Sequence, residues 1–353
     1  MRAALWYGRK DVRIENVPEP LSPEEDEVLV KIVWCGICGT DLHEYLAGPI
    51  TIPAKNPHPL TKRRAPIILG HEAIGEVLEV GEKVSHCEPG DRVVFYPVIG
   101  CGGCWWCREG RPHLCSKVAF IGSSWDGGMA EYMRVPASNC YFIPPDLSSE
   151  EATLVEPLAA AIRATKRAQV KPGETALVVG AGPMGLCVIQ ALRGAEVESV
   201  FAVEKIPERR KMAKQLGAKE TFDRTTLKTK KRIFKLTDEI GPKYVFECVS
   251  VKDTADFSFK MVRKSGKIII LGIFEKTELF NYTDLVYSEK EVLGSMGGGG
   301  EFESTINLLT LQKINLGPLI TKKIPLSRLI EEGFEVMVEQ REKNIKILVD
   351  PRK

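Results

Sequence analysis

The glycine-rich segment GAGPMG, residues 180–185, constrains the fold of this chain more than any other stretch. It follows a continuous apolar run at 174–180 and opens a segment of helical periodicity at 182–194. In the pattern G-x-G-x-x-G, the first glycine permits a tight turn and the second lets a pyrophosphate approach the helix N-terminus. The third lets helix and strand pack closely. The segment therefore predicts a dinucleotide site that includes Gly180, Gly182, Pro183, Met184 and Gly185.

The next apolar run, 199–204, ends in Glu204, 24 residues after Gly180. A carboxylate at this distance accepts hydrogen bonds from the ribose hydroxyls of NAD and repels the 2′-phosphate of NADP, so NAD is the predicted cofactor. Arg209 is included in the predicted cofactor site. With Lys205 and Arg210 it leaves NADP open as an alternative, although such residues also form ordinary solvated helix faces.

Alternating strands and helices continue beyond the glycine segment and predict a parallel sheet covered on both faces. Before residue 150 the chain instead shows short β patterns separated by Gly and Pro, which indicate a mostly β, barrel-like domain. A chain of 353 residues suits two domains. The tail contains one helix and one strand, is too short to fold alone, and is expected to rejoin the first domain. We therefore predict segments 1–153, 154–296 and 297–353.

Charge and hydropathy exclude several classes of partner. Lys plus Arg number 49 and Asp plus Glu 47, so a net charge of +2 favours neither nucleic acid nor a membrane surface. The uncharged stretch 175–192 contains three glycines and a proline, and is interpreted as strand, turn and helix rather than a membrane span. The N-terminus does not resemble a signal peptide, so we expect a cytoplasmic protein.

Ten cysteines in a reducing compartment favour metal binding over disulfides. Four of them follow the spacing C-x2-C-x2-C-x7-C, which can close a tetrahedral zinc shell and leaves no position for a substrate. The prediction is a structural zinc. An iron–sulfur cluster, a nucleic-acid-binding ribbon and four unliganded thiols are the alternatives. The predicted ligands are Cys101, Cys104, Cys107 and Cys115.

Three further short motifs contain side chains of the types that bind metals: CGICGTDLH at 35–43, GHE at 70–72 and EP at 156–157. Taken alone each is a modest signal. Cys35 and Cys38 also form a C-x-x-C, but no thioredoxin-like βαβ unit surrounds it. A single histidine such as His43 or His71 is more often structural than a ligand.

Taken together, the motifs of this chain resemble those of the zinc-dependent medium-chain alcohol and polyol dehydrogenases. They occur in the same order and along essentially the whole chain. Besides the four-cysteine segment and the motifs just named, they include GHEAIGEVLEVGEKV, GDRV, LVEPLA and VVGAGPMG. The resemblance implies a GroES-like catalytic domain carrying a structural-zinc lobe, and a Rossmann NAD-binding domain. It also implies a homo-oligomer, with a tetramer favoured over a dimer, and small alcohols or ketones as substrates.

Carried onto this sequence, the resemblance implies that a catalytic zinc is held by Cys38, His71 and Glu156. Glu72 would be an exchanging ligand. Thr40 would receive the substrate proton and His43 would pass it to solvent. Three protein ligands with one open position are typical of a catalytic rather than a structural zinc.

The proline-rich segment 43–66, between two ligand words, is similar to that of the (R,R)-2,3-butanediol dehydrogenase branch, which implies vicinal diols and hydroxyketones as substrates. A sorbitol-like polyol dehydrogenase or L-threonine 3-dehydrogenase is the enzymatic alternative. A zinc scaffold without catalysis and a zinc-free quinone reductase are disfavoured because the ligands are present. Ser123, Ser124 and Trp125 depart from the expected pattern, and Trp125 is expected to reshape the substrate pocket.

Overall fold

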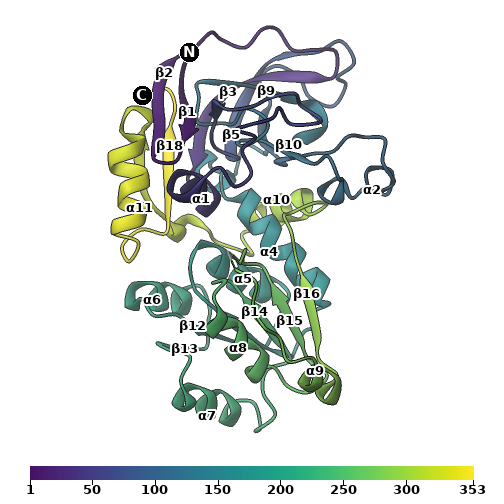
Figure 1. Cartoon of the computed structure of the whole chain (residues 1–353), viewed down its shortest axis with the longest axis vertical. Helices are drawn as coiled ribbons and strands as arrows, with labels where there is room; N and C mark the ends of the chain where they lie inside the picture. The colour runs from purple at the N-terminus through teal and green to yellow at the C-terminus, as the bar shows by residue number, and fades with distance from the viewer. Residues whose placement is uncertain (275) are drawn as a thin grey trace. The chain divides into compact units, whose positions relative to one another are not determined.

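The computed structural model describes residues 1–274 and 276–353, which divide into two compact units (Figure 1). Unit 1 comprises Met1–Glu156, Phe302–Ile306 and Ile320–Lys353. Unit 2 comprises Pro157–Glu301 and Asn307–Leu319. The C-terminal segment is thus divided between the units, and the last 34 residues belong to unit 1.

Unit 1 is mostly β. Its largest sheet has seven strands in the order β10-β6-β5-β3-β18-β17, with β9 also paired to β3. A three-stranded sheet, β2-β1-β4, and the pair β7-β8 complete the unit. The strands are β1 (Arg2–Gly8), β2 (Asp11–Asn16), β3 (Glu27–Gly36), β4 (Ile67–Ile68), β5 (Glu72–Val80), β6 (Arg92–Phe95), β7 (Val98–Ile99), β8 (Ala119–Phe120), β9 (Tyr132–Pro136), β10 (Cys140–Phe142), β17 (Ile320–Pro325) and β18 (Lys346–Asp350).

The strand register brings the end of the chain beside the candidate site. β3 pairs antiparallel with β18, so that Gly36 lies opposite Leu348 and Cys35 opposite Val349. All five residues of β18 are buried, because this strand is enclosed between β3 and β17. The C-terminal strand therefore lies next to the strand that leads into Cys38.

Short helices connect the strands of unit 1. They are α1 (Gly39–Ala47), α2 (Trp105–Arg108), α3 (Ser149–Ala152) and α11 (Glu335–Glu339). The core beneath them includes Trp6, Val30, Ile32 and Phe95, each at most 1% exposed. The residues that precede and begin α1 are consequently held on a rigid β framework.

Unit 2 contains a six-stranded sheet in the order β13-β12-β11-β14-β15-β16, and every neighbouring pair is parallel. The order reverses between β11 and β14, which is the point where doubly wound sheets bind ligands. The strands are β11 (Thr175–Val179), β12 (Ser199–Val203), β13 (Glu220–Phe222), β14 (Tyr244–Glu247), β15 (Lys267–Ile270) and β16 (Glu291–Gly294). The predicted fold class, a mostly β unit with a doubly wound parallel sheet, is confirmed.

The helices of unit 2 are α5 (Pro183–Gly194), α6 (Pro207–Gln215), α7 (Leu227–Lys235), α8 (Lys252–Met261) and α9 (Tyr282–Ser288). Two further helices contribute residues to both units, α4 (Val155–Ala168) and α10 (Phe302–Thr310). In the described part of the chain, no helix combines the length and the apolar character that a bilayer span requires.

Candidate metal centres and cofactor site

Cys38 stands where β3 gives way to α1. It occupies the N-cap position, and its backbone N–H donates to the carboxylate of Asp41 at 2.8 Å. The Thr40 hydroxyl lies 3.7 Å from the Cys38 sulfur. His43, one turn further along α1, is exposed. The helix thus begins beside a thiol, places a hydroxyl next to it, and carries an exposed imidazole one turn further on.

His71 and Glu72 follow a turn that only glycine fits. Gly70 has φ +94°, and a Cβ on it would lie 2.6 Å from the Cys35 sulfur. This conformation favours glycine and lets the chain pass close to β3. The ligand atoms of Cys38, His71 and Glu72 all lie within 4.8 Å of one another.

Glu156, the second residue of α4, approaches the same cluster. It is not among the side chains whose ligand atoms lie within 4.8 Å, but it and His71 influence each other's titration. Loss of hydration raises the pKa of Glu156 to about 7, partly opposed by the charge of His71. Among the four predicted ligands, the structure therefore brings three into one group and places the fourth within electrostatic reach.

His71 has the electrostatic character of an imidazole facing anions. Burial lowers its pKa, but the charge of the Cys38 thiolate and a hydrogen bond to it raise the pKa well above its usual value. Asp41 adds to this effect, with a carboxylate oxygen 3.9 Å from His71 Nδ1. Asp41 therefore faces the imidazole as a charge partner, and a carboxylate beside the ring is a common arrangement behind a metal-binding histidine.

Glu72 forms an ion pair with Lys346 of β18. Lys346 Nζ also donates to the Ile37 carbonyl at 3.0 Å, so this buried ammonium is satisfied on two sides. Sequence analysis missed Lys346 and Asp41. A lysine directly before the apolar residues Ile347–Val349 was the available signal for Lys346, but its partner lies 274 positions away.

The donor set fits zinc. Thiolate, imidazole and carboxylate are its usual protein ligands, and one of each converges here in Cys38, His71 and Glu72, all of them at least partly buried. When bound, the metal would supply Lewis-acid polarisation of a substrate oxygen.

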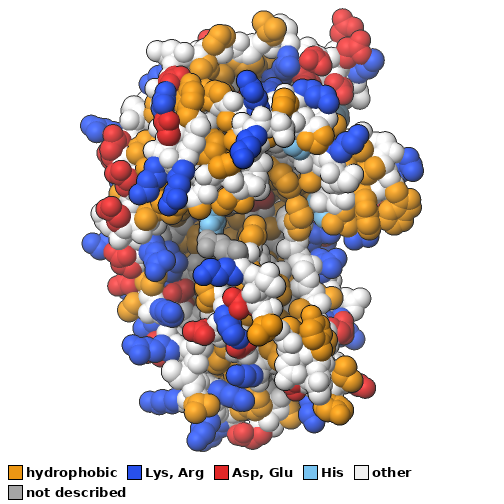
Figure 2. Space-filling view, in the orientation of Figure 1, with side chains coloured by type: hydrophobic (Ala, Val, Ile, Leu, Met, Phe, Trp, Pro, Cys, Tyr) orange, Lys and Arg blue, Asp and Glu red, His pale blue; other side chains and the backbone are white. Residues whose placement is uncertain are grey.

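The four-cysteine segment forms a second group whose sulfur atoms lie within 4.8 Å of one another. Backbone hydrogen bonds from Cys104 and Gly103 lower the pKa of Cys101 to about 6, and the N–H of Lys117 donates to the Cys115 sulfur at 3.3 Å. Backbone donors of this kind stabilise thiolates, the form that binds metal. Apolar side chains gather on the surface of this lobe, around the position of α2 (Figure 2).

In unit 2, the predicted glycine positions have the expected geometry. Gly180 has φ +92°, and a Cβ at Gly185 would collide with the Gly180 carbonyl oxygen. A Cβ on Gly182 would meet only the Arg209 guanidinium, at 3.5 Å, so the approach to the N-terminus of α5 is open to a pyrophosphate. Pro183 and Met184 form the first turn of that helix.

Glu204 lies at the end of β12 and points back to the glycine segment. Its carboxylate accepts hydrogen bonds from the N–H groups of Ala181 at 2.8 Å and Ile206 at 3.0 Å. Arg210 donates to the carbonyls of Glu204 and Lys205, at 2.8 and 2.7 Å. The carboxylate is thus fixed beside the phosphate-binding turn, while one of the basic residues is held by the backbone.

The segment 48–66 is anchored to residues 118–126. The His58 imidazole contacts the Val118 carbonyl at 3.1 Å, and the Thr61 hydroxyl donates to the Ser124 carbonyl at 2.7 Å. The guanidinium of Arg63 lies 4.6 Å above the Trp125 ring. The Trp125 indole N–H donates to the carbonyl of Arg134 in β9 at 2.8 Å, so this side chain is used as an anchor between segments.

Each of the two units contains a segment that matches a known protein family. Residues 24–145 match the model of the alcohol dehydrogenase GroES-like domain, and residues 183–311 match that of the zinc-binding dehydrogenases. The chain therefore belongs to the zinc-binding alcohol dehydrogenase family and is an oxidoreductase, which confirms the resemblance noted from its sequence.

Individual relatives cover almost the whole chain. An (R,R)-butanediol dehydrogenase of Bacillus subtilis is 39% identical over 99% of this chain and 100% of its own. The crystal structure of the 2R,3R-butanediol dehydrogenase from that organism superposes with a TM-score of 0.93, covering 99% of both chains. An L-threonine 3-dehydrogenase of Pyrococcus furiosus is 33% identical over 96% of this chain and 94% of its own. Similar solved structures include one bound to NADP and one complexed with NADH, with TM-scores of 0.88 and 0.89.

Proposed function

We propose that this protein oxidises the secondary hydroxyl of a vicinal diol, with 2,3-butanediol to acetoin as the leading pair, and catalyses the reverse reduction. A hydride passes from the carbinol carbon to NAD, one proton is released, and the products are a ketone and NADH. The observation that carries the proposal is the cluster of Cys38, His71 and Glu72 at the start of α1, with a hydroxyl beside it. The butanediol dehydrogenase relatives support the substrate class.

The site residues have distinct roles in this proposal. Cys38, His71 and Glu156 would hold the catalytic zinc, with Glu72 exchanging into the shell. Thr40 Oγ1 would receive the hydroxyl proton, and the exposed His43 would transfer it to solvent. Asp41 would orient His71, and Lys346 would hold Glu72 as a carboxylate.

Two oxygens on adjacent carbons distinguish a diol from ethanol at such a site. The second oxygen can meet polar groups near Glu156 or segment 48–66, and a substrate without it leaves a polar group unpaired, at a cost of about 1–3 kcal/mol. We expect kcat/KM for 2,3-butanediol to exceed that for ethanol by roughly ten- to a hundredfold. The oxidised carbon should have the R configuration, as in the relatives' names.

A substrate panel tests this proposal. Diols, acetoin, sorbitol, L-threonine and ethanol should be assayed with NAD(H) and NADP(H), together with Cys38→Ser as a metal-site control. The variant should lose turnover yet still bind NADH, because the glycine segment lies in unit 2. If sorbitol or threonine is turned over faster than every small diol, the substrate assignment is wrong.

NAD is proposed over NADP because Glu204 would face the 2′-phosphate, and an unpaired like-charge contact costs several kcal/mol. Gly180, Gly182, Pro183, Met184 and Gly185 would cradle the pyrophosphate, and Arg209 would lie beside it. Equal kcat/KM for the two cofactors in the panel would show that Arg209 or Lys205 neutralises the extra phosphate.

The four-cysteine lobe is proposed to hold a second, structural zinc on Cys101, Cys104, Cys107 and Cys115. The close packing of Gly100 supports a fixed site, because a Cβ there would lie 2.7 Å from the Cys107 sulfur. Two zinc ions per chain are therefore the expected stoichiometry.

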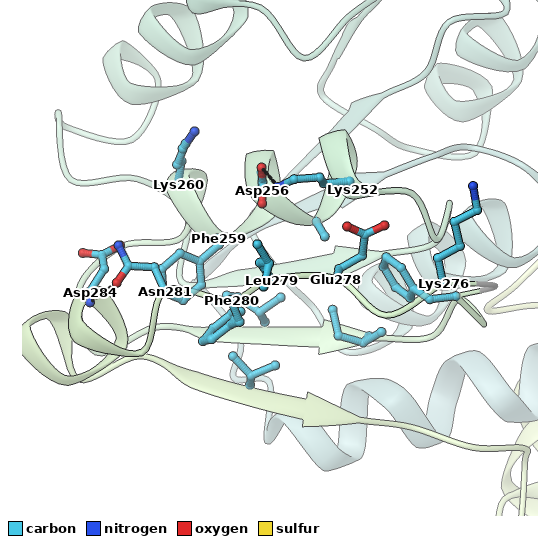
Figure 3. A pocket seen from close by; sticks show the side chains of 15 residues that line it. Lys252, Asp256, Phe259, Lys260, Lys276, Glu278, Leu279, Phe280, Asn281 and Asp284 are labelled. Carbon is cyan, nitrogen blue, oxygen red and sulfur yellow. Dashed lines mark hydrogen bonds and ion pairs between the residues drawn. The ribbon is translucent and has the colours of Figure 1, made fainter.

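A cytoplasmic homo-oligomer is also proposed, with a tetramer favoured over a dimer. None of the ten cysteines, all of which lie in the described part of the chain, forms a disulfide, which fits a reducing compartment. In unit 2, β16 forms one edge of the sheet, and a cavity of about 630 Å³ lies beside it, lined in part by Phe259, Leu279 and Phe280 (Figure 3). An edge strand beside exposed apolar side chains fits pairing with a second copy of the chain.

A further inference from the structure

We propose that Glu44 is a positioning residue for substrate binding: its buried carboxylate fixes residues 50–52 against α1, and thereby fixes segment 48–66 beside the metal ligands. The inference rests on the proposed function, because it assigns that segment a role in binding the substrate.

The Glu44 side chain is 2% exposed and is surrounded by donors from one short stretch of chain. It accepts hydrogen bonds from the backbone N–H groups of Ile50 at 2.9 Å and Ile52 at 3.1 Å. It also accepts from the Thr51 N–H and, at 2.7 Å, from the Thr51 hydroxyl. Four donors converging on one carboxylate satisfy a buried charge and hold the donors in a single arrangement.

Glu44 itself is held in place. Its carbonyl accepts hydrogen bonds from the Trp6 indole at 3.0 Å and from the Gly48 N–H at 3.0 Å. Trp6 is 1% exposed and belongs to the core of unit 1. The anchor of residues 50–52 is therefore connected to the rigid β framework.

Segment 48–66 connects the two sequence motifs that contain the proposed metal ligands Cys38 and His71. It follows α1, whose N-cap is Cys38, and runs to β4, which ends three residues before His71. Glu44 is one helical turn from Thr40, on the same face of α1. At the C-terminal end of the segment, Asp126 forms an ion pair with Arg63. The Asp126 carboxylate also accepts a hydrogen bond from the Ile68 N–H at 3.2 Å. Residues 122–128 pack on the backbone of Gly70. The segment is thus fixed at both of its ends, which adjoin the candidate ligands along the chain, and Glu44 fixes the end nearer Thr40.

The test compares Glu44→Gln with Glu27→Gln. Glu27 is a matched control, because it is also buried in unit 1, at 4% exposed, and binds one backbone N–H and Arg134. In Glu44→Gln the side-chain oxygen can keep the three hydrogen bonds that Oε1 accepts, but the amide NH2 takes the place of Oε2 and faces the Ile50 N–H, so residues 50–52 should be held less firmly. We expect KM for the best secondary alcohol to rise roughly tenfold with kcat changed by less than about threefold, and only in Glu44→Gln.

Hydrogen exchange gives a readout independent of activity. The amides of residues 50–52 should exchange at least about tenfold faster in Glu44→Gln than in the wild type or Glu27→Gln. If Glu44→Gln does not fold, Thr51→Val, which removes one donor, should produce the same changes to a smaller extent, and Thr51→Ser should restore wild-type behaviour.

The outcomes separate the two proposals. Unchanged exchange at 50–52, or equal KM effects in both glutamine variants, would overturn the role of Glu44 while leaving the diol dehydrogenase proposal intact. A wild-type protein that oxidises no alcohol would overturn the proposed function, and with it the substrate-binding role, whatever the exchange rates show.

Discussion

Glu72 and Lys346 form an ion pair between side chains that are 1% and 2% exposed. Removing one partner of such a pair leaves an uncompensated buried charge, which costs about 3–5 kcal/mol. Lys346→Met should therefore strongly lower the denaturant midpoint of unfolding. Lys323→Met is the control, since Lys323 pairs with Glu150 on the surface at 2.7 Å. An exposed pair contributes about 0–1 kcal/mol.

The double variant Lys346→Met/Glu72→Gln should recover most of the lost stability, because it removes both charges together. If Lys346→Met is no more destabilising than Lys323→Met, the pair does not hold Glu72 in the manner described.

The raised pKa of Glu156 leads us to expect that zinc uptake depends on pH. Burial raises its pKa from 4.5 to about 7, so between these values the folded, metal-free protein binds more protons at this group than the unfolded chain. This contribution to stability is present at low pH and decreases as the pH rises toward about 7. Zinc needs the carboxylate, so binding must displace the proton below about pH 7.

Zinc affinity should consequently fall as the pH decreases below 7, by about tenfold per pH unit for each proton displaced. Competition with a chromophoric chelator measures it, on protein whose four-cysteine site is already filled. Glu156→Gln has no proton to lose, so the slope should fall by about one proton. An unchanged slope would assign the proton to another ligand, such as His71.

At the level of elements, the strands and helices that cross the core could be predicted from the sequence. The apolar run 174–180 and the helical pattern 182–194 correspond to β11 and α5, because burial imposes a clear periodicity on them. No strand was predicted for residues 291–294, which form β16. Every residue of β16 is exposed or partly exposed, so this segment carries no buried apolar run that would mark it as a strand.

The grouping of the candidate site was predictable where its side chains lie in short sequence motifs, such as those of Cys38 and His71, whose ligand atoms the structure brings together. The ligand types and their spacing are local. The partners that fix them are not local, since Lys346 reaches Glu72 across 274 positions. Trp125 was expected to reshape the substrate pocket, which stays a prediction; its indole N–H donates to the Arg134 carbonyl, and the Arg63 guanidinium lies over its ring.

The four-cysteine lobe should behave as a structural element. Its sulfur atoms lie within 4.8 Å of one another, and a closed cysteine shell leaves no position for a substrate. Cys107→Ser should lower thermal stability and release about one zinc per chain, while the folded fraction retains its catalytic zinc and activity. Zinc analysis and activity per folded molecule test this. A variant with normal stability but no turnover would instead place chemistry at this cluster.

For the whole molecule, the exposed edge of unit 2 predicts how copies assemble. Near β16 lie apolar side chains that are between 42% and 89% exposed: Ile273, Leu279, Tyr282, Val286, Tyr287 and Val292. Patches of this kind on soluble proteins mark interaction sites. Two copies of an edge strand related by a two-fold axis can pair antiparallel, and in β16 this would bring Val292 and Leu293 of the two copies together.

Val292→Lys places a charge in the middle of that strand, a substitution that blocks edge pairing. We expect the mass measured by light scattering during size-exclusion chromatography to fall by at least about half, because a self-complementary interface is lost in both partners at once. Leu227→Lys is the matched control, since Leu227 is 78% exposed and lies in the helix that follows β13, at the opposite edge of the sheet. The control should keep the wild-type mass. An unchanged mass in Val292→Lys, or an equal fall in both variants, would show that the copies do not assemble through β16.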